Sequence, residues 1–303
     1  MPDRRADEFR KLIEPLRVKP GARVRLPRDF DPGHTAGIVS KAEAATLLQR
    51  GTELLAEYQE RLAAQDTYGL LVVIQAMDAA GKDGTIRHVM SGVNPQGVEV
   101  TSFKVPSAEE LDHDYLWRTA KRLPSRGMIG IFNRSYYEEV LVVRVHPEIL
   151  AGQKLPKEAR GRDVWKNRFR DINAFEHHLV DNGFPVVKLF LNVSKEAQRK
   201  RFLDRIDEPH ANWKFNAGDA RERQRWDDYQ AAYADVLSNT STDWAPWHVI
   251  PADHKWFMRL AASAAIVDAL MQIDPRWPVP TPEAKAAMLD AKQQLLAEGP
   301  PAG

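Results

Sequence analysis

The stretch GLLVVIQAMDAAGKDGT, residues 69–85, decides the fold of this chain. Its first part, residues 69–75, is a short aliphatic run rich in β-branched residues, which predicts a strand buried on both faces. Its second part follows that strand directly, carries small residues around Gly81 and Lys82, and opens a helix predicted over residues 84–91. A strand, a loop of small residues and a helix in this order form the context that a phosphate-binding loop requires.

The rest of the chain repeats this alternation. Four more stretches are strand candidates, over residues 98–103, 128–132, 185–191 and 247–250. Residues with helical spacing lie between and before them, over 41–63, 108–122, 164–182, 194–205 and 220–237. Strands that alternate with helices predict an α/β fold in which helices cover both faces of a parallel sheet.

Turn signals at both ends divide the chain into three parts. We expect an N-terminal arm over residues 1–35, with one short helix near 7–13, and a main domain over residues 36–274. A C-terminal tail over 275–303 begins with prolines at 275, 278, 280 and 282, which are followed by an alanine-rich helix. Pro and Gly mark such boundaries because they interrupt regular backbone hydrogen bonding.

The composition excludes several classes of protein. The chain has 303 residues and 34.4 kDa, with 43% hydrophobic and 28% charged residues, which excludes wholesale disorder, collagen and coiled coil. Lys and Arg number 43 against 42 Asp and Glu, so the chain is no globally basic nucleic-acid binder. The absence of Cys excludes disulfides, thiolate metal sites and Cys nucleophiles, and it suits a reducing cytosol.

The chain also lacks the sequence signals of export. Residues 3–10 are charged and contain no apolar core of a signal peptide. The apolar runs at 70–74 and 140–143 are far shorter than the ~20 residues that a bilayer requires. We therefore expect a cytoplasmic protein that binds neither nucleic acid nor a membrane.

Positive charge gathers in two segments of this nearly neutral chain, residues 154–170 and 199–225. The first holds Lys154, Lys157, Arg160, Arg162, Lys166, Arg168 and Arg170, and the second Arg199, Lys200, Arg201, Arg205, Lys214, Arg221, Arg223 and Arg225. Either set is also typical of a solvated helix face. Their clustering favours an anionic ligand, and we expect both segments to line the groove that holds it.

The loop after the first strand carries the first chemical signal. Small residues allow backbone N–H groups to approach phosphate oxygens, and the start of a helix adds partial positive charge. The candidate phosphate ligands are Ala79, Ala80, Gly81, Lys82, Asp83, Gly84 and Thr85. The loop departs from the usual pattern, because Ala76 replaces its first Gly and Asp83 replaces its Ser or Thr. The alternative is an ordinary turn capped by Asp78.

A second signal, IGIFNRSYYE at residues 129–138, lies at the end of a predicted strand, where α/β sheets place their ligands. Asn133 stands where related enzymes often carry a Mg²⁺-binding Asp. Metal binding would then depend on Asp78, Asp83 or Glu138. Arg134 suits a bidentate contact with phosphate, unless it is a structural partner of the neighbouring acids.

The third signal is a basic helix followed by an aromatic segment. Arg201 and Arg205 are four residues apart and share one helix face, and Lys214 follows in Trp213-Lys214-Phe215. Two guanidinium groups on one face suit a flexible lid that closes over phosphates. The alternative is a surface helix in which Asp204 and Asp207 neutralise the arginines.

Together the three segments resemble the polyphosphate kinase 2 family, from about residue 36 to 273. Residues 78–84 resemble its phosphate-binding loop, residues 132–138 its second motif, and residues 201–229 its lid. The resemblance implies a P-loop (Walker A) kinase-like α/β/α sandwich with a helical lid, here at about 194–238. It also implies phosphoryl transfer between inorganic polyphosphate and nucleotides with Mg²⁺, and a homo-oligomer, either a dimer or a tetramer.

The resemblance extends to a subclass. Phe132-Asn133-Arg134-Ser135, followed by residues 138–146, resembles members that accept both AMP and ADP, with ADP and ATP as products. We expect Asp78, Lys82, Arg134, Arg201 and Arg205 to be catalytic. Asp78 and Glu138 would hold the metal, while Asn133, Glu138 and Lys214 would join the loop in binding phosphate and nucleotide.

Two other functions remain open at this point. An ATP-dependent kinase of nucleoside monophosphates or another small molecule would share the loop and the lid but needs no long anionic groove. A protein that binds polyphosphate or nucleotide as a sensor would fit the departures at Ala76, Asp83 and Asn133.

Overall fold

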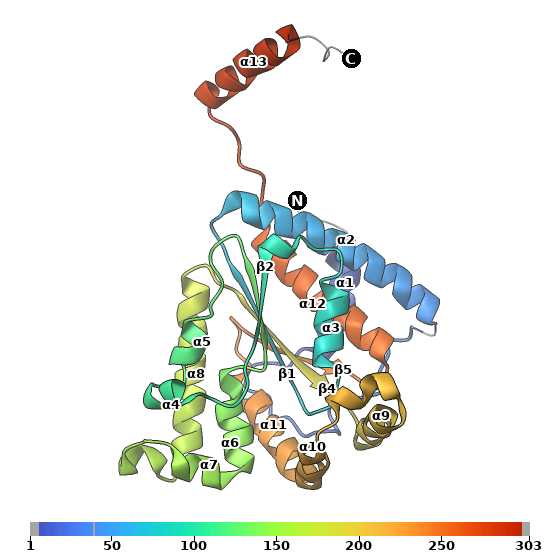
Figure 1. Ribbon diagram of the computed structural model, residues 1–303, viewed down its shortest axis with the longest axis vertical. Helices are drawn as coiled ribbons and strands as arrows, with labels where there is room; N and C mark the ends of the chain where they lie inside the picture. The colour runs from blue at the N-terminus through green and yellow to red at the C-terminus, as the bar shows by residue number, and fades with distance from the viewer. Residues whose placement is uncertain (1–5, 39, 299–303) are drawn as a thin grey trace.

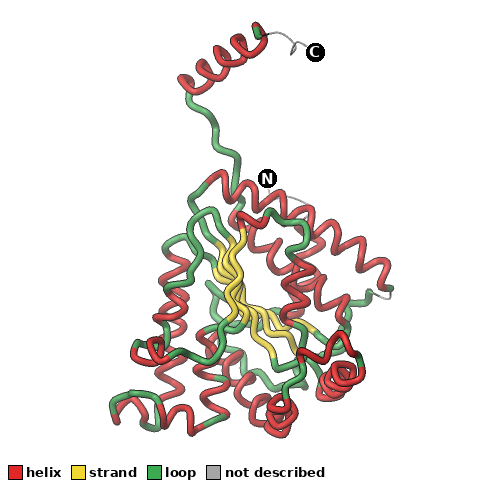
Figure 2. Tube along the Cα trace, in the orientation of Figure 1, coloured by secondary structure: helices red, strands yellow, loops and turns green. Residues whose placement is uncertain are grey.

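Five parallel strands form one sheet at the centre of the structure, a computed structural model that describes residues 6–38 and 40–298. In chain order they are β1 (Leu70–Ala76), β2 (Val98–Ser102), β3 (Ile129–Asn133), β4 (Val186–Asn192) and β5 (Trp247–Pro251). The order across the sheet is β2-β3-β1-β4-β5, so β1 lies in the middle (Figures 1 and 2). Every residue of β1, β3, β4 and β5 is buried. The predicted parallel α/β sheet is confirmed.

Helices cover the sheet from two sides (Figure 1). On one side α12 (Lys255–Ile273) packs against α1 (Ala6–Ile13), α2 (Lys41–Gln65) and α3 (Lys82–Val89). On the other side α11 (Trp226–Thr240) packs against α6 (Val142–Val145) and α8 (Val164–Asp181). The other helices are α4 (Ala108–Asp112), α5 (Trp117–Ala120), α7 (Pro147–Gly152), α9 (Lys195–Asp207) and α10 (Ala217–Glu222), and α13 (Pro282–Ala297) lies in the tail.

Two predictions of a long, continuous helix are wrong. The helix expected over 108–122 is divided into α4 and α5, because the Asp114 carboxylate accepts the Leu116 N–H at 2.9 Å and starts a new turn. The helix expected over 220–237 is likewise divided into α10, a 3₁₀ turn (Arg223–Arg225) and α11. The other predicted strands and helices agree with the structure to within a few residues at their ends.

The first residues of the described chain belong to the core. Phe9, Ile13, Leu16 and Val18 are buried, and the Val18 N–H donates to the Trp247 carbonyl at 2.8 Å. The predicted arm is therefore packed against the sheet edge at β5, while the boundary at residue 35 stays a prediction.

One helix, α12, is long and apolar enough to cross a bilayer by length and composition alone. Most of its residues are buried between α1, α2 and the sheet, which is the environment of a core helix. The sequence analysis did not predict this helix. Its buried residues lie on nearly every side, so they leave no amphipathic periodicity to detect.

Candidate active site

The loop between β1 and α3 has the backbone geometry of a phosphate cradle. Ala79 and Gly81 both have positive φ, +60° and +110°. A Cβ on Gly81 would lie 3.1 Å from the Met258 methyl group, so only glycine fits without strain. Gly81 caps α3, whose first residue is Lys82, and the free N–H groups of the first turn lie at the loop.

Lys82 is folded back on this loop. Its Nζ donates to the Ala76 carbonyl at 3.0 Å. Burial and the neighbouring Arg134 charge lower the pKa of Lys82 to about 8, against the opposing effect of Asp78 and Glu138. An anionic ligand beside the ammonium would stabilise its charged form and raise that pKa.

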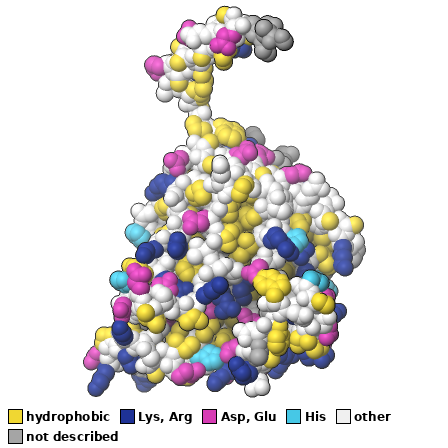
Figure 3. Space-filling model, viewed as in Figure 1, with side chains coloured by type: hydrophobic (Ala, Val, Ile, Leu, Met, Phe, Trp, Pro, Cys, Tyr) yellow, Lys and Arg dark blue, Asp and Glu magenta, His cyan; other side chains and the backbone are white. Residues whose placement is uncertain are grey.

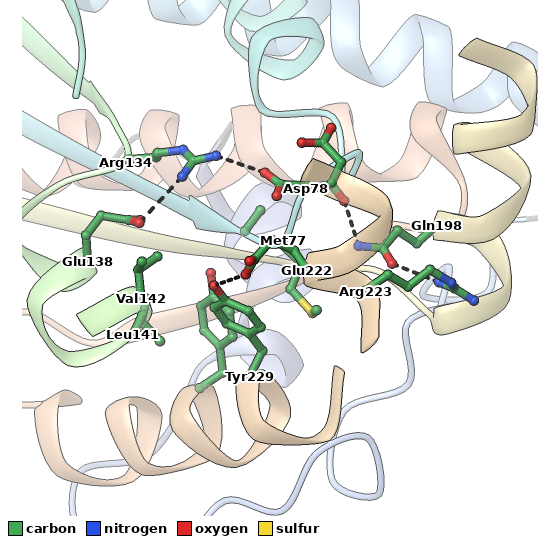
Figure 4. A pocket seen from close by; sticks show the side chains of 13 residues that line it. Met77, Asp78, Arg134, Glu138, Leu141, Val142, Gln198, Glu222, Arg223 and Tyr229 are labelled. Carbon is green, nitrogen blue, oxygen red and sulfur yellow. Dashed lines mark hydrogen bonds and ion pairs between the residues drawn. The ribbon is translucent and has the colours of Figure 1, made fainter. Parts of the chain in front are cut away.

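Arg134 connects the loop to the end of β3 (Figure 4). Its guanidinium lies 2.8 Å from an Asp78 oxygen and 3.5 Å from a Glu138 oxygen. Its φ of +65° is uncommon for a residue with a side chain, and such strain is found most often at functional sites. Burial raises the pKa of the Glu138 carboxyl, although the Arg134 charge opposes this shift.

A buried polar network fixes the turn that carries Arg134 and Glu138. The hydroxyls of Tyr136 and Tyr137 each donate to the Glu176 carboxylate at 2.8 Å. Lys188 on β4 donates to the same carboxylate at 2.6 Å, and neither charged side chain is exposed. A buried ion pair with this many hydrogen bonds orders its surroundings, so the network holds the second motif in place.

The neutral side chain at 133 is a hydrogen-bond donor. Asn133 Nδ2 donates to Asp83 at 2.6 Å and more weakly to the Ser102 hydroxyl at 3.4 Å. The amide therefore holds the first turn of α3 to the end of β3. An Asp at 133 would instead repel Asp83.

The two lid arginines have different surroundings. Arg201 is buried, and its guanidinium donates to the carbonyls of Ala79, Ala80, Ala252 and Asp253. Burial lowers its pKa, in spite of the nearby Asp253 charge. Arg205 is partly exposed and lies 3.4 Å from Asp219. Lys214 ends a 3₁₀ turn (Pro209–Lys214), and its side chain lies outside the described part.

These residues border a groove of about 1180 Å³ at the carboxyl ends of the strands. We call it the basic groove, because its lining includes Lys82, Arg87, Lys104, Arg134, Arg201, Arg205, Lys255 and Arg259. Figure 3 shows Lys and Arg side chains gathered near the middle of the viewed face. Arg87, Lys104, Lys255 and Arg259 were missed by the sequence analysis. Lys104 and Lys255 follow the ends of β2 and β5, so the strand-end rule offered a signal for them.

The expectation that residues 154–170 line this groove is wrong, since none of them is among its lining residues. Arg168 pairs with Glu139 at 3.0 Å, and Lys154 pairs with Asp112. Arg160 donates to backbone carbonyls of its own segment. These cations are used to hold local structure together.

A second, narrow pocket, with a volume of about 30 Å³, shares Asp78 and Arg134 with the basic groove (Figure 4). Asp78, Arg134 and Glu138 line one side of it, and Glu222 and Tyr229 line it from α10 and α11. This volume admits about a single water, whereas sites for small organic ligands occupy roughly 300–1,000 Å³. A nucleotide can enter here only if the lid helices move away.

The donor chemistry fits a divalent cation. Asp78 and Glu138 place carboxylates on either side of Arg134, and both line the narrow pocket. In the described residues, no group of three or more His, Cys, Asp or Glu side chains is placed to hold a metal. Mg²⁺ needs no such group, because it is usually bound by one or two carboxylates together with substrate phosphates.

Comparisons with known proteins point to one family. The family model of Polyphosphate kinase 2 matches residues 38–277. An ADP-polyphosphate phosphotransferase of Rhodopseudomonas palustris is 50% identical over 93% of this chain and 97% of its own length. An AMP/ADP-polyphosphate phosphotransferase of Meiothermus ruber is 44% identical over 88% of this chain and 96% of its own.

A solved structure supports the same assignment. The crystal structure of polyphosphate kinase 2 from Arthrobacter aurescens superposes with a TM-score of 0.79 and 39% sequence identity. The superposition covers 91% of this chain and 98% of that one. On the strength of its sequence and its fold, the chain belongs to the polyphosphate kinase 2 family.

Proposed function

We propose that this protein transfers the terminal phosphoryl group of inorganic polyphosphate to AMP and ADP, giving ADP and ATP, and that the transfer is reversible. The observation that carries the proposal is the basic groove, whose lining sets eight Lys and Arg side chains against four carboxylates and includes Lys82 and the phosphate cradle. An ordinary small-molecule kinase has no need of the cations beyond the loop, at Lys104 and Arg259. The names of the relatives support polyphosphate as the donor.

The reaction exchanges one phosphoanhydride bond for another. A terminal phosphate oxygen of the nucleotide attacks the last phosphorus of polyphosphate and forms a new P–O bond. The bond to the next phosphate breaks, and its electron pair leaves with the shortened polyphosphate. The attacking phosphate has a second pKa near ~6 and is largely ionised at neutral pH. The site therefore needs no dedicated general base.

The protein's task is to reduce repulsion between two polyanions and to stabilise the transferring group. Lys82 would leave the Ala76 carbonyl to contact the donor phosphates, and Arg134 would exchange part of its pairing with Asp78 for a phosphate oxygen. Arg205, which is only loosely paired with Asp219, would approach from the lid.

Arg201 has a different task in this proposal. Its hydrogen bonds to Ala79 and Ala80 hold the cradle, and those to Ala252 and Asp253 tie it to the end of β5. We therefore expect it to act mainly by positioning the loop.

Asp78 and Glu138 would hold Mg²⁺, with Asn133 and the loop N–H groups nearby to position phosphate. When bound, the cation supplies charge neutralisation for the phosphate oxygens at the reacting centre. A homo-oligomer and a cytoplasmic location are proposed from the sequence alone.

The test is an assay of the purified protein with Mg²⁺ and long-chain polyphosphate, with AMP or ADP added separately and the nucleotides separated by chromatography. ATP from ADP together with ADP from AMP would establish the dual acceptor. Product from one acceptor alone would overturn the subclass but keep the donor. Product from ATP and AMP, with none from polyphosphate, would overturn the proposal in favour of an ordinary nucleotide kinase.

A further inference from the structure

A separate cavity of about 370 Å³ lies at the amino-terminal ends of the strands, whereas the phosphate cradle lies at their carboxyl ends. It is bordered by α1, by the amino-terminal ends of β4 and β5, and by the last two turns of α12. It shares no lining residue with the basic groove or the narrow pocket. Its volume lies in the range of about 300–1,000 Å³ typical of small-molecule sites. We call it the far cavity.

Most of its surface is apolar. The apolar lining comes from Ile13, Val180, Val186, Val187, Ala265 and Ala269, and Tyr68 and Trp244 add aromatic surface. Such a lining suits the hydrocarbon or aromatic part of a ligand. It has too few cationic side chains to bind an inorganic polyanion.

His248 supplies an unsatisfied polar atom at this lining. Its side chain is 9% exposed, and its Nδ1 has no hydrogen-bond partner in the described part of the chain. Burial, together with the Arg17 charge, lowers the pKa of His248 to about 4, so the ring is neutral at physiological pH. Buried polar atoms are nearly always paired, and an orphan of this kind indicates a missing partner.

Arg17 supplies a charge beside it. The backbones of Arg17 and His248 form an antiparallel bridge, and Arg17 lines the far cavity, partly buried. Among the described residues, no carboxylate forms an ion pair with its guanidinium. The other cation of the lining, Arg10, is already paired with Asp268 at 3.1 Å.

The remaining charges of the far cavity are accounted for. Asp268 accepts from Gln272 at 2.5 Å in addition to Arg10, so its carboxylate is satisfied. Glu14 and Asp243 are exposed at the rim, where water screens them. In the described lining, Arg17 is thus the partly buried charge that lacks a counterion.

We propose that the far cavity binds a small carboxylate with an apolar body, a site independent of the phosphotransfer proposed above. The carboxylate would pair with the Arg17 guanidinium, whose geometry matches two oxygens. It would also accept a hydrogen bond from His248 Nδ1 in the neutral tautomer that carries its proton on that nitrogen. The apolar body would pack against Ile13 and the end of α12, with Trp244 beside it.

The experiment uses the full chain with three acids as probes, hexanoate, benzoate and 3-phenylpropanoate, each compared with its neutral amide. Binding is followed by the side-chain NMR signals of His248, assigned from the spectrum of His248→Gln. We expect at least one acid to shift these signals in a saturable way. Its amide should bind with an affinity lower by a factor of about ten or more, because a charge-assisted hydrogen bond is lost.

Two matched variants locate the charge. Arg17→Gln should weaken binding of the acid about tenfold and leave that of the amide nearly unchanged. Arg23→Gln, an exposed arginine of the same segment outside the cavity lining, should bind the acid as the wild type does. If Arg17→Gln is poorly folded, Ala269→Met tests the site by filling the cavity, and it should abolish binding.

Several results would overturn the proposal. These are no shift at His248 with any of the three acids, equal affinity for acid and amide, or equal losses in Arg17→Gln and Arg23→Gln. Displacement of the acid by polyphosphate would place it in the basic groove instead. Because binding is read at His248, failure here leaves the phosphotransferase assay unaffected, and failure of that assay leaves this test intact.

Discussion

Lys82, in the lining of the basic groove, has its ammonium 3.0 Å from the Ala76 carbonyl. Lys82→Ala removes the charge that would meet the donor phosphates in the transition state. We expect turnover to fall about 10³-fold or more, by comparison with the 10³ to 10⁵ that an arginine finger supplies in related chemistry. Steady-state kinetics with polyphosphate and ADP measure the effect, and Lys285→Ala on the exposed α13 is the control. Near-normal turnover in Lys82→Ala would remove this lysine from the site.

Asp78 is paired with Arg134 at 2.8 Å. Asp78→Asn keeps the shape of the side chain but removes the charge that would hold Mg²⁺. We expect the Mg²⁺ concentration for half-maximal rate to rise about tenfold or more, because hard cations prefer charged oxygen ligands. A Mg²⁺ titration at fixed substrate measures the change, with Asp290→Asn as the control. An unaltered Mg²⁺ dependence would leave Asp78 only its pairing with Arg134.

At the scale of elements, β1 and β4 were predictable because burial on both faces leaves a mainly aliphatic run. The helices between them were less so. Nothing in hydrophobic spacing indicated that Asp114 would end one turn and begin another. In the site, the position of the phosphate-binding loop could be predicted from its small residues. The role of Arg201 did not, since its four carbonyl partners come from segments more than 50 residues away.

His146 connects α10, a helix of the proposed lid, to α7. Its Nε2 lies 2.9 Å from Glu222 on α10, and its Nδ1 lies 3.0 Å from Glu148 on α7. Both contacts are hydrogen bonds only when both ring nitrogens carry protons. Burial lowers the pKa of His146, but the two carboxylates outweigh this effect and raise it above its ordinary value of 6.5. Tyr229 also donates to Glu222, at 2.8 Å.

This contact predicts a pH-dependent lid. A raised pKa means that the contact is complete below the ordinary pKa of His and is lost as the pH rises through the raised value. We expect proteolytic cleavage within residues 209–222 to speed up over that pH range in the wild type. The variant His146→Gln should be cleaved quickly at every pH, and His177→Gln, an exposed histidine on α8, should follow the wild type. A pH-independent wild type would contradict the prediction.

At the scale of the whole molecule, a buried charge pair joins the sheet to one of its helical layers, because Lys188 lies on β4 and Glu176 on α8. Lys188 and Glu176 are both fully buried, 2.6 Å apart. Lys188→Met would leave the Glu176 carboxylate without its counterion in the core. We expect the free energy of unfolding to fall by about 3–5 kcal/mol, measured by urea denaturation. Lys195→Met, at the surface of α9, is the control. If Lys188→Met lowers the free energy of unfolding no more than Lys195→Met does, the pair contributes little.

We expect the C-terminal tail to contribute little to the stability and the activity of the rest of the molecule. α13 projects away from the sheet and its helices (Figure 1), and the side chains over residues 281–298 are exposed. Removal of residues 281–303 should therefore change the free energy of unfolding by no more than about 0.5 kcal/mol, as for surface changes in general. The same truncation should leave turnover with polyphosphate and ADP unchanged, because no residue of α13 lines the groove or either cavity in the described chain. Urea denaturation of the truncated and full chains at two protein concentrations measures both the stability and its dependence on association. A lower stability of the truncated chain, together with a stability that rises with protein concentration in the full chain alone, would contradict the prediction. It would show that the exposed apolar residues of α13, among them Met288 and Leu295, pack against a second copy.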